Sequence, residues 1–334
     1  MSSYPTQSSA SGIWNIGDIS LFIQDGAWPT PLFGDLGVFA GGLTPAKTNV
    51  IDYVIITSLG NAIDFGDLNV AIHGAGGFGS NTRGIIAGGT NAADTGVNTI
   101  QYITYASKGN TTNFGTLSSG ARVNSPGTFS NSTRGISGGG EGVGPTYPIT
   151  NVVDFVTIAT TGNATDFGDL LGATYALSGT ASSTRGVFAG GNTPGGQTNV
   201  IQFVTIASIG NTTDFGDLTN ARMRVNNGQV CSGTRGVFAG GRAGPAASNT
   251  IDFITIASAG NATAFGDLTN VTDATLGSGS NTTRGVFGGN LTPTITNIIS
   301  YITIATAGNA IDFGDLTISR AYVGGLSNAN GALS

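Results

Sequence analysis

One unit of about 50 residues occurs six times in this sequence, and this repetition restricts the chain to a repeat architecture. Each unit contains a short apolar string of the type TRGVFAGG, found at residues 37–42, 82–89, 133–140, 184–191, 234–241 and 283–289. A second string of the type NVIDFVTIASxGNATDFGDL follows each copy, at residues 49–68, 98–117, 151–170, 199–218, 249–268 and 297–316. Six such similar copies do not arise by chance.

Each unit predicts four β-strands. The GVFAGG string is one strand, and its two glycines end it. In the next strand Ile251 and Phe253 point one way while Ile254 and Ile256 point the other, which is typical of a strand buried on both faces. A Gly-Asn turn leads to a third strand, ATDFGDL, and the remaining strand lies in the variable stretch before each TRG, such as Ala221–Ser232. Radially repeated four-stranded sheets are propeller blades.

The composition excludes the main alternatives to a β fold. There are 56 glycines in 334 residues without a G-X-Y period, which excludes collagen. Good helix formers are scarce, with one glutamate, two lysines and two methionines, so helical folds and α/β enzymes are excluded. The 39% hydrophobic content argues against disorder.

Charge and targeting signals exclude several functions. The net charge is −6 and no window concentrates Lys or Arg, so we expect no nucleic-acid partner. No apolar run is long enough for a membrane-spanning helix, and residues 1–46 contain no secretory signal. The single cysteine, Cys231, rules out internal disulfides and is expected to be a small buried side chain.

The repeats resemble the kelch family of β-propellers. The resemblance rests on the strand-ending diglycine, the later aromatic strand and the period of about 50 residues, and it covers residues 37–334. The chain departs from the kelch pattern because its later aromatic is the Phe of FGDL (Phe65, Phe114, Phe167, Phe215, Phe265 and Phe313). This variant is more similar to repeats in virion structural proteins of tailed phages, especially marine and cyanobacterial ones.

The strand order predicts how the ring closes. The chain enters the repeats at a diglycine strand, and its last segment, Ser319–Asn328, aligns with the variable stretch. We therefore predict an all-β, six-bladed kelch-like propeller with four-stranded blades over residues 36–334, whose C-terminal strand joins the blade that contains Gly37–Gly42. Residues 1–35 form a short N-terminal extension outside the repeats.

A repeated charge pattern suggests pairing between blades. The TRG arginine is missing only in the first unit, where Leu36 stands, and the FGDL aspartate only in the second, where Thr116 stands. If each arginine pairs with the aspartate of the following blade, all five find partners, which matters because a lone buried charge is costly. The predicted structural inter-blade pairs therefore involve Arg83, Arg134, Arg185, Arg235 and Arg284 with Asp67, Asp169, Asp217, Asp267 and Asp315.

The N-terminal extension contains both tryptophans and an apolar stripe. Two interpretations stay open: a plug or cap on the propeller, or an anchor that docks onto another virion protein or a sister subunit. Its ASGIW…WP block resembles the start of phage virion proteins with such repeats, which favours the anchor. The candidate docking residues are Ile13, Trp14, Ile16, Ile19, Phe22 and Trp28.

The sequence contains no recognisable catalytic constellation. One Cys and one His cannot supply a copper site like that of galactose oxidase. A sialidase would need arginines, a tyrosine and carboxylates gathered at one site, whereas the arginines and carboxylates here repeat around the ring. We expect no enzyme activity, no cofactor and no metal. The single histidine, His73, is interpreted as an ordinary polar residue on an innermost strand.

The loop after each diglycine varies in length and content, whereas the SNTRG and GN turns vary little. Variable loops on a rigid scaffold commonly carry recognition, although drifting solvated loops would look the same. The candidate recognition residues are Lys47, Glu141, Tyr147 and Arg242.

The resemblance implies a non-enzymatic phage virion structural protein: a tail fibre, spike or capsid decoration subunit. It would be made in the host cytoplasm, be held to other virion proteins through residues 1–35, and function in host attachment through a host surface glycan or protein, without membrane insertion. The alternative is a glycan-binding or glycan-cleaving propeller, lectin-like or sialidase-like.

Overall fold

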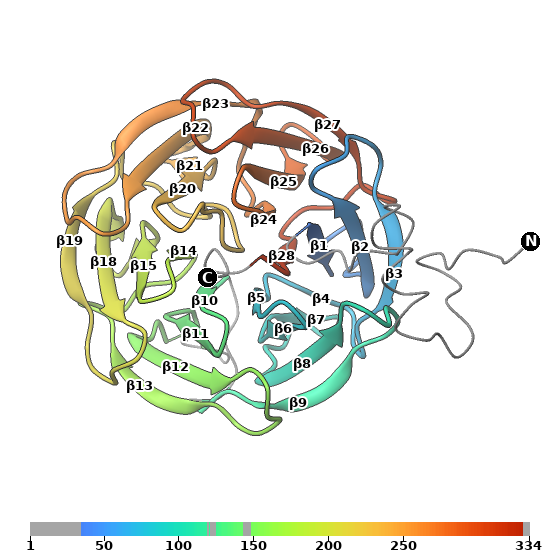
Figure 1. The fold of residues 1–334 in the computed structure, drawn as a ribbon, viewed down its shortest axis with the longest axis horizontal. Coiled ribbons are helices and arrows are strands. Elements are labelled where there is room, and N and C mark those ends of the chain that lie inside the picture. Colours follow the sequence, from blue (N-terminus) through green and yellow to red (C-terminus); the bar gives the residue numbers. More distant parts are fainter. Residues whose placement is uncertain (1–34, 119, 121–124, 143–147, 330–334) are drawn as a thin grey trace, which may run out of the picture. The chain divides into compact units, whose positions relative to one another are not determined.

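The computed structural model describes residues 35–118, 120, 125–142 and 148–329. Within these ranges the chain forms six antiparallel sheets arranged around one axis, as the blades of a β-propeller (Figure 1). The predicted extension, residues 1–35, lies outside the described residues except for Asp35, so the predicted domain boundary stays a prediction.

Each blade has its strands in the same order from the axis outwards. Blade 1 contains β28 (Gly324–Ser327), β1 (Leu36–Ala40), β2 (Val50–Ile55) and β3 (Ile63–Asp67), and blade 2 contains β5 (Gly76–Gly79), β6 (Arg83–Ala87), β8 (Thr99–Thr104) and β9 (Thr112–Thr116). Blade 3 contains β10 (Gly127–Ser130), β11 (Arg134–Gly138), β12 (Val152–Thr157) and β13 (Thr165–Asp169). Blade 4 contains β14 (Ser178–Ala181), β15 (Arg185–Ala189), β18 (Val200–Thr205) and β19 (Thr213–Asp217). Blade 5 contains β20 (Arg235–Ala239), β22 (Ala246–Thr255) and β23 (Thr263–Thr272), and blade 6 contains β24 (Gly277–Ser280), β25 (Arg284–Leu291), β26 (Ile295–Thr303) and β27 (Ile311–Asp315).

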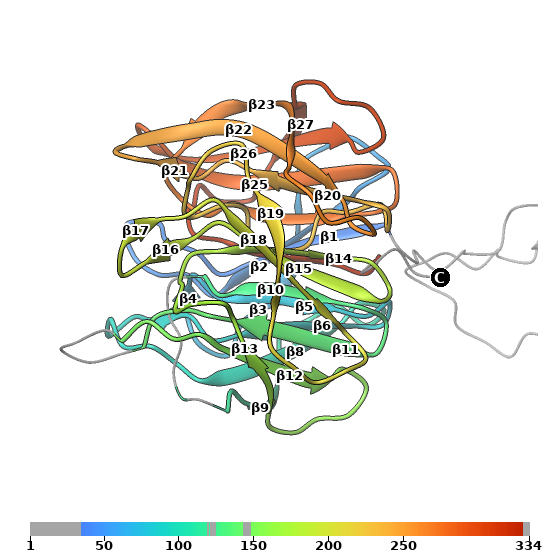
Figure 2. The same ribbon diagram turned by 90° about the vertical axis from the view of Figure 1, so that its left-hand side faces the viewer.

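The propeller has two unlike faces (Figure 2). We call "turn face" the side with the SNTRG and GN turns, and "loop face" the side with the diglycine loops and the connections from each outer strand to the next blade. Short strands extend the loop face: β4 (Ile72–His73) pairs with β7 (Thr90–Asn91), β16 (Asn192–Thr193) with β17 (Gly196–Gln197), and β21 (Arg242–Ala243) with β22.

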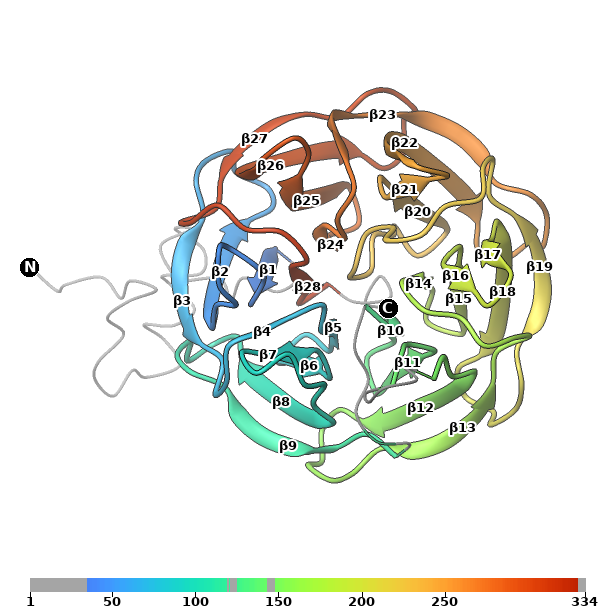
Figure 3. The same ribbon diagram turned by 180° about the vertical axis from the view of Figure 1, so that it is seen from behind.

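The ring is closed by strand exchange, as predicted. β28, at the C-terminal end of the repeats, pairs antiparallel with β1, and Val38 lies opposite Leu326 (Figure 3). Blade 1 therefore takes its innermost strand from one end of the chain and its other three strands from the opposite end.

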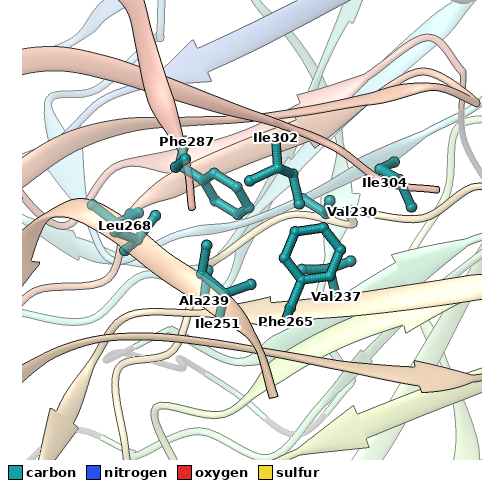
Figure 4. Packing of buried hydrophobic residues seen from close by; sticks show 11 residues of the cluster. Val230, Val237, Ala239, Ile251, Phe265, Leu268, Phe287, Ile302 and Ile304 are labelled. Atoms are coloured by element: carbon teal, nitrogen blue, oxygen red, sulfur yellow. The ribbon is translucent and has the colours of Figure 1, made fainter. Parts of the chain in front are cut away.

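The hydrophobic core lies between the blades rather than within them. One cluster joins Val237, Ile251 and Phe265 of blade 5 to Phe287 and Ile302 of blade 6, all nearly inaccessible to solvent (Figure 4). Because each sheet has apolar side chains on both faces, a blade can bury them only against two neighbours. The repeat is therefore stable only as a ring.

Backbone hydrogen bonds connect the outer edge of each blade to the next blade. At the closure, Gly60 N–H donates to Phe313 O at 3.0 Å and Ala62 N–H donates to Asp315 O at 2.7 Å. Asn61 Oδ1 accepts from Asp315 N–H at 3.1 Å. The same asparagine contact recurs at the other five junctions, through Asn110, Asn163, Asn211, Asn261 and Asn309. The GN turn therefore covers the exposed edge of the preceding outer strand, which would otherwise be open to aggregation.

This contact explains the glycine of FGDL. Gly168 has φ +143°, and a Cβ placed on it would lie 2.5 Å from Gly210 O in the next blade. The corresponding glycines of the other blades meet the next GN turn in the same way. A side chain at this position would push the two blades apart.

The propeller axis is filled with protein. Ser125 and Thr275, from opposite blades, are joined by an Oγ–Oγ1 hydrogen bond of 3.1 Å. Gln229 Oε1 accepts from Ser130 N–H at 2.9 Å, and Asn227 Nδ2 donates to Ala75 O. A Cβ on Gly325 would lie 1.9 Å from Ser278 N, so the innermost strands also touch. Side chains and backbone of different blades therefore meet across the axis.

The innermost strand of blade 5 differs from the prediction. We expected a strand within Ala221–Ser232, but this segment forms only isolated bridges, Met223 with Arg242, Asn227 with Gly277 and Cys231 with Gly236. The physical reason is that residues 227–229 turn into the axis and bond to other blades, while Asn226 and Val230 on either side still bond to β20.

We predict that Gly168→Ala destabilises the propeller by about 2–4 kcal/mol, because it adds backbone strain and a steric clash with Gly210 O. Urea-induced unfolding at equilibrium measures this free energy. Gly210→Ala is the matched control, since a Cβ there has no atom within 4 Å. Equal effects of the two substitutions would contradict this explanation of the junction.

Candidate functional site

The five TRG arginines connect adjacent blades, but through partners other than the predicted ones. Each guanidinium lies over an aromatic ring of its own blade at 4.2 to 4.9 Å from the centroid. Its Nη1 donates to one or two backbone carbonyls of the following blade at 2.7 to 3.3 Å. Arg185, for example, lies over Phe203 and bonds to Ile256 O.

The predicted ion pairs between the TRG arginines and the FGDL aspartates are therefore wrong. None of Arg83, Arg134, Arg185, Arg235 and Arg284 forms an ion pair with Asp67, Asp169, Asp217, Asp267 or Asp315 in the described structure. The two groups lie too far apart because they stand at opposite ends of their strands. Each arginine begins its strand at the turn face, whereas each aspartate ends its outer strand at the loop face. A strand of five residues separates these two levels by about 13 Å.

Blade 1 replaces its missing arginine with a lysine from blade 2. Leu36 stands where the other blades have arginine, and it is buried. Lys108 Nζ lies 4.2 Å from the Tyr53 ring centroid and donates to Tyr53 Oη at 2.6 Å. A cation thus covers the corresponding aromatic ring in every described blade.

Two buried ion pairs were not predicted. Arg320 Nη2 lies 2.8 Å from Asp52 Oδ2, and Arg222 Nη2 lies 3.1 Å from Asp252 Oδ2, with all four side chains inaccessible to solvent. Each arginine comes from the connection that enters the blade of its aspartate. Burial lowers the pKa of Arg320 to about 10, so Arg320 is charged at neutral pH, and burial also lowers the pKa of Arg222.

The sequence did contain a signal for these pairs. The third strand carries Asp52, Asp154 and Asp252 in blades 1, 3 and 5, and an arginine (Arg320, Arg122 and Arg222) occurs in the connection before each of these blades. Arg122 lies outside the described residues. Blades 2 and 4 have Gln101 and Gln202 instead and lack this arginine. An aspartate that occurs only in blades preceded by such an arginine indicates an ion pair between the two.

The junction between blades 5 and 6 lacks this buried contact. Gln202 Oε1 accepts from Leu171 N–H at 2.8 Å, and Asp252 accepts from Thr219 N–H at 3.3 Å, but blade 6 has the shorter Ser300 at this position. A cavity of about 20 Å³ lies there, lined by Ser300, Thr269 and Asn290 among others. It is large enough for about one water molecule.

On the loop face, charged and aromatic side chains gather where three adjacent blades begin. Arg224 enters blade 5 and donates from Nη1 to Asp273 Oδ1 at 3.0 Å, in the connection that enters blade 6. Arg242 Nη1 lies 3.7 Å from Asp273 Oδ2. Tyr322, which enters blade 1, has its ring 5.4 Å from the Arg224 guanidinium. We call Arg224, Arg242, Asp273 and Tyr322 the loop-face cluster.

A second polar group adjoins this cluster. The His73 ring lies 5.6 Å from the Tyr322 ring, and Lys47 forms an ion pair with Asp94 nearby. Burial, and secondarily the Lys47 cation, lower the pKa of His73 to about 4, so the imidazole is neutral at physiological pH. His73 lies on β4 rather than on an innermost strand, which corrects its predicted position.

The described recognition candidates lie on the loop face in different blades. Lys47 follows β1 in blade 1, Glu141 follows β11 in blade 3, and Arg242 follows β20 in blade 5, so other blades separate them. Tyr147 lies outside the described residues, as do the candidate docking residues Ile13, Trp14, Ile16, Ile19, Phe22 and Trp28. Of the four, only Arg242 belongs to the loop-face cluster.

Cys231 is buried in an apolar cluster, as predicted. No group of three or more His, Cys, Asp or Glu side chains is arranged to hold a metal ion within the described ranges. No helix in the described part of the chain is suited to crossing a membrane.

The fold defines the chain as a six-bladed antiparallel β-propeller, with the same four-stranded order in every blade except blade 5, closed by its C-terminal strand. No protein-family model matches the sequence, and no curated protein matches it significantly.

We predict that Asp252→Asn destabilises the fold by about 3–5 kcal/mol, because it leaves the buried Arg222 without an anionic partner. Asp217→Asn, at the outer edge of blade 4, should change stability by less than about 0.5 kcal/mol. Chemical denaturation of both variants measures the difference. A large effect at Asp217 would instead support the ion pairs that the sequence suggested.

We predict opposite effects for two nearly isosteric substitutions at the cavity. Ser300→Asn supplies an acceptor for Thr269 N–H and should stabilise the fold by about 1 kcal/mol. Ser300→Asp should destabilise it by about 3 kcal/mol at pH 7, because Thr272 stands where blade 5 has Arg222.

The pH dependence separates charge from shape at Ser300. A buried carboxyl is penalised only when ionised, so the deficit of Ser300→Asp should shrink as the pH falls towards about 4. Thermal unfolding from pH 7 to pH 4 measures this. A deficit that does not change with pH would mean that the cavity rejects the side chain sterically.

Proposed function

We propose that this chain is a non-enzymatic structural protein of a tailed-phage virion. Residues 1–35 attach it to other virion proteins, and the propeller presents its loop face outwards as a fibre, spike or decoration subunit. The repeat pattern, which resembles kelch-like repeats of such virion proteins, supports this assignment. No cofactor, nucleic acid or membrane is part of the proposal.

The observation that carries the proposal is how the charged side chains are used. The five TRG arginines hold adjacent blades together on the turn face. Arg222 and Arg320 do so in the interior. Charged side chains that repeat around the ring and hold the blades together are typical of a structural protein. Catalysis instead needs one unrepeated set of groups at a single site.

Localisation in purified particles tests the assignment. Mass spectrometry of gradient-purified virions from a lysate that contains this chain should detect it at a fixed ratio to the major capsid protein. Its absence from the particles, with abundance in the soluble lysate, would overturn the proposal.

A double substitution tests whether residues 1–35 attach the chain to the virion. Trp14→Ala with Ile16→Ser in the full-length chain should lower incorporation into virions at least tenfold while leaving thermal unfolding unchanged. Ile209→Ser is the control, because Ile209 is an exposed apolar side chain of the propeller itself, 63% accessible. Incorporation that depends equally on Ile209 would place the docking surface elsewhere.

One observation favours the alternative of a glycan-binding or glycan-cleaving propeller: the loop-face cluster has no counterpart repeated around the ring. A cleaving enzyme would release reducing ends from a polysaccharide on incubation with the purified chain. A binding protein would not.

A further inference from the structure

Nearly every cation of the described chain has its own structural partner. Twelve Lys and Arg residues occur in the sequence, and all except Arg122 lie in the described ranges. Five arginines bond to carbonyls of the next blade, Lys108 covers Tyr53, and Lys47, Arg222 and Arg320 each have one carboxylate. Arg224 and Arg242 alone share a single carboxylate, that of Asp273.

The sharing leaves a local excess of positive charge on an acidic protein. Two guanidinium groups and one carboxylate give the loop-face cluster a net charge of +1, while the whole chain carries −6. The Arg224, Arg242 and Asp273 side chains are 28%, 33% and 30% accessible, so an external anion can reach them. Guanidinium groups bind carboxylates and other oxyanions through paired hydrogen bonds.

Arg224 and Tyr322 have left-handed backbone, as do Ser125 and Ala176 at the corresponding positions of blades 3 and 4. Arg224 has φ +58° and Tyr322 has φ +53°, in the left-handed region that favours glycine. Gly74 holds the corresponding position, two residues before the innermost strand, in blade 2 with φ +65°. Two large polar side chains therefore occupy positions where glycine would relieve strain.

Tyr322 adds a neutral hydrogen-bond donor. Burial is the main cause that raises the pKa of its hydroxyl, so the group stays protonated at physiological pH. Its ring lies 5.4 Å from the Arg224 guanidinium and 5.6 Å from the His73 ring, which holds it in the loop-face cluster.

We propose that the loop-face cluster binds the anionic oxygens of an acidic polysaccharide, with Arg224 and Arg242 as the charged donors and Tyr322 as a neutral donor. Asp273 is a positioning residue that holds the two guanidinium groups side by side. The source of the ligand, a host surface, rests on the proposed function, but the binding site does not. Carboxylate and sulfate groups share this chemistry.

Affinity electrophoresis of the purified full-length chain tests the site. Polygalacturonate supplies carboxylates, dextran sulfate supplies sulfates, and neutral dextran supplies neither. We expect retardation by at least one anionic polymer and none by dextran, and the two anionic arms identify the group that is bound. Retardation by neutral dextran, or by none of the three, would overturn the proposal.

Variants separate binding from folding. Arg224→Gly and Arg242→Gln should each raise the dissociation constant at least tenfold, and Arg224→Gly should not lower the unfolding temperature because it relieves strain. Ala176→Gly, at the same left-handed position in blade 4, and Lys108→Gln, which removes a charge from the turn face, should bind like the parent chain. If Lys108→Gln weakens binding as much as Arg224→Gly, the attraction is a general charge effect and the proposal fails.

The two proposals fail separately. A chain that occurs in virions but binds the anionic polymers equally well without Arg224 contradicts only the loop-face site. A chain that needs Arg224 for binding but is absent from virions contradicts only the assignment as a virion protein.

Discussion

The close approach of two backbones at each blade junction is the constraint on which the propeller depends. The GN turn of one blade lies against the FGDL glycine of the blade before it, and one or two backbone hydrogen bonds join them. This contact satisfies donors and acceptors of the outer strand, aligns neighbouring sheets and brings their apolar faces together. Every blade places its GN turn on the outer strand of the preceding blade, and its own outer strand is covered by the following blade. The ring therefore has no free outer edge within its described strands.

Inside this sixfold frame, the buried polar contacts follow a period of two blades. Asp52, Asp154 and Asp252 lie in alternate blades, and Gln101 and Gln202 lie between them. At the equivalent position of blade 6, the shorter Ser300 does not form the hydrogen bond to the preceding blade, and a cavity lies beside it. The propeller is therefore three pairs of blades with one altered pair, and the loop-face cluster spans the entries to blades 5, 6 and 1, next to that alteration.

The six repeats made the fold predictable from the sequence. The residues of the loop-face cluster are not repeated, so the sequence did not predict that they lie together. Six copies fixed the number of blades, the strand order and the closure by the C-terminal strand, because each copy had to occupy an equivalent place. The same symmetry misled the charge pairing: counting Arg83 and Asp67 around the ring ignored that they lie at opposite ends of their strands. The buried Arg222–Asp252 pair was visible only as joint occurrence between units. The loop-face cluster joins unrepeated residues such as Arg224 and Tyr322, whose proximity depends on left-handed backbone that no spacing indicates.

The exchange of strands in blade 1 has a mechanical consequence. β1 begins directly after the segment that precedes the propeller, and it is hydrogen-bonded along its length to β2 on one side and to β28 on the other. A pull along β1 from its N-terminal end therefore loads both rows of backbone hydrogen bonds in parallel rather than one bond after another. In the proposed attachment through residues 1–35, a load would therefore enter the propeller through a strand that is paired on both sides.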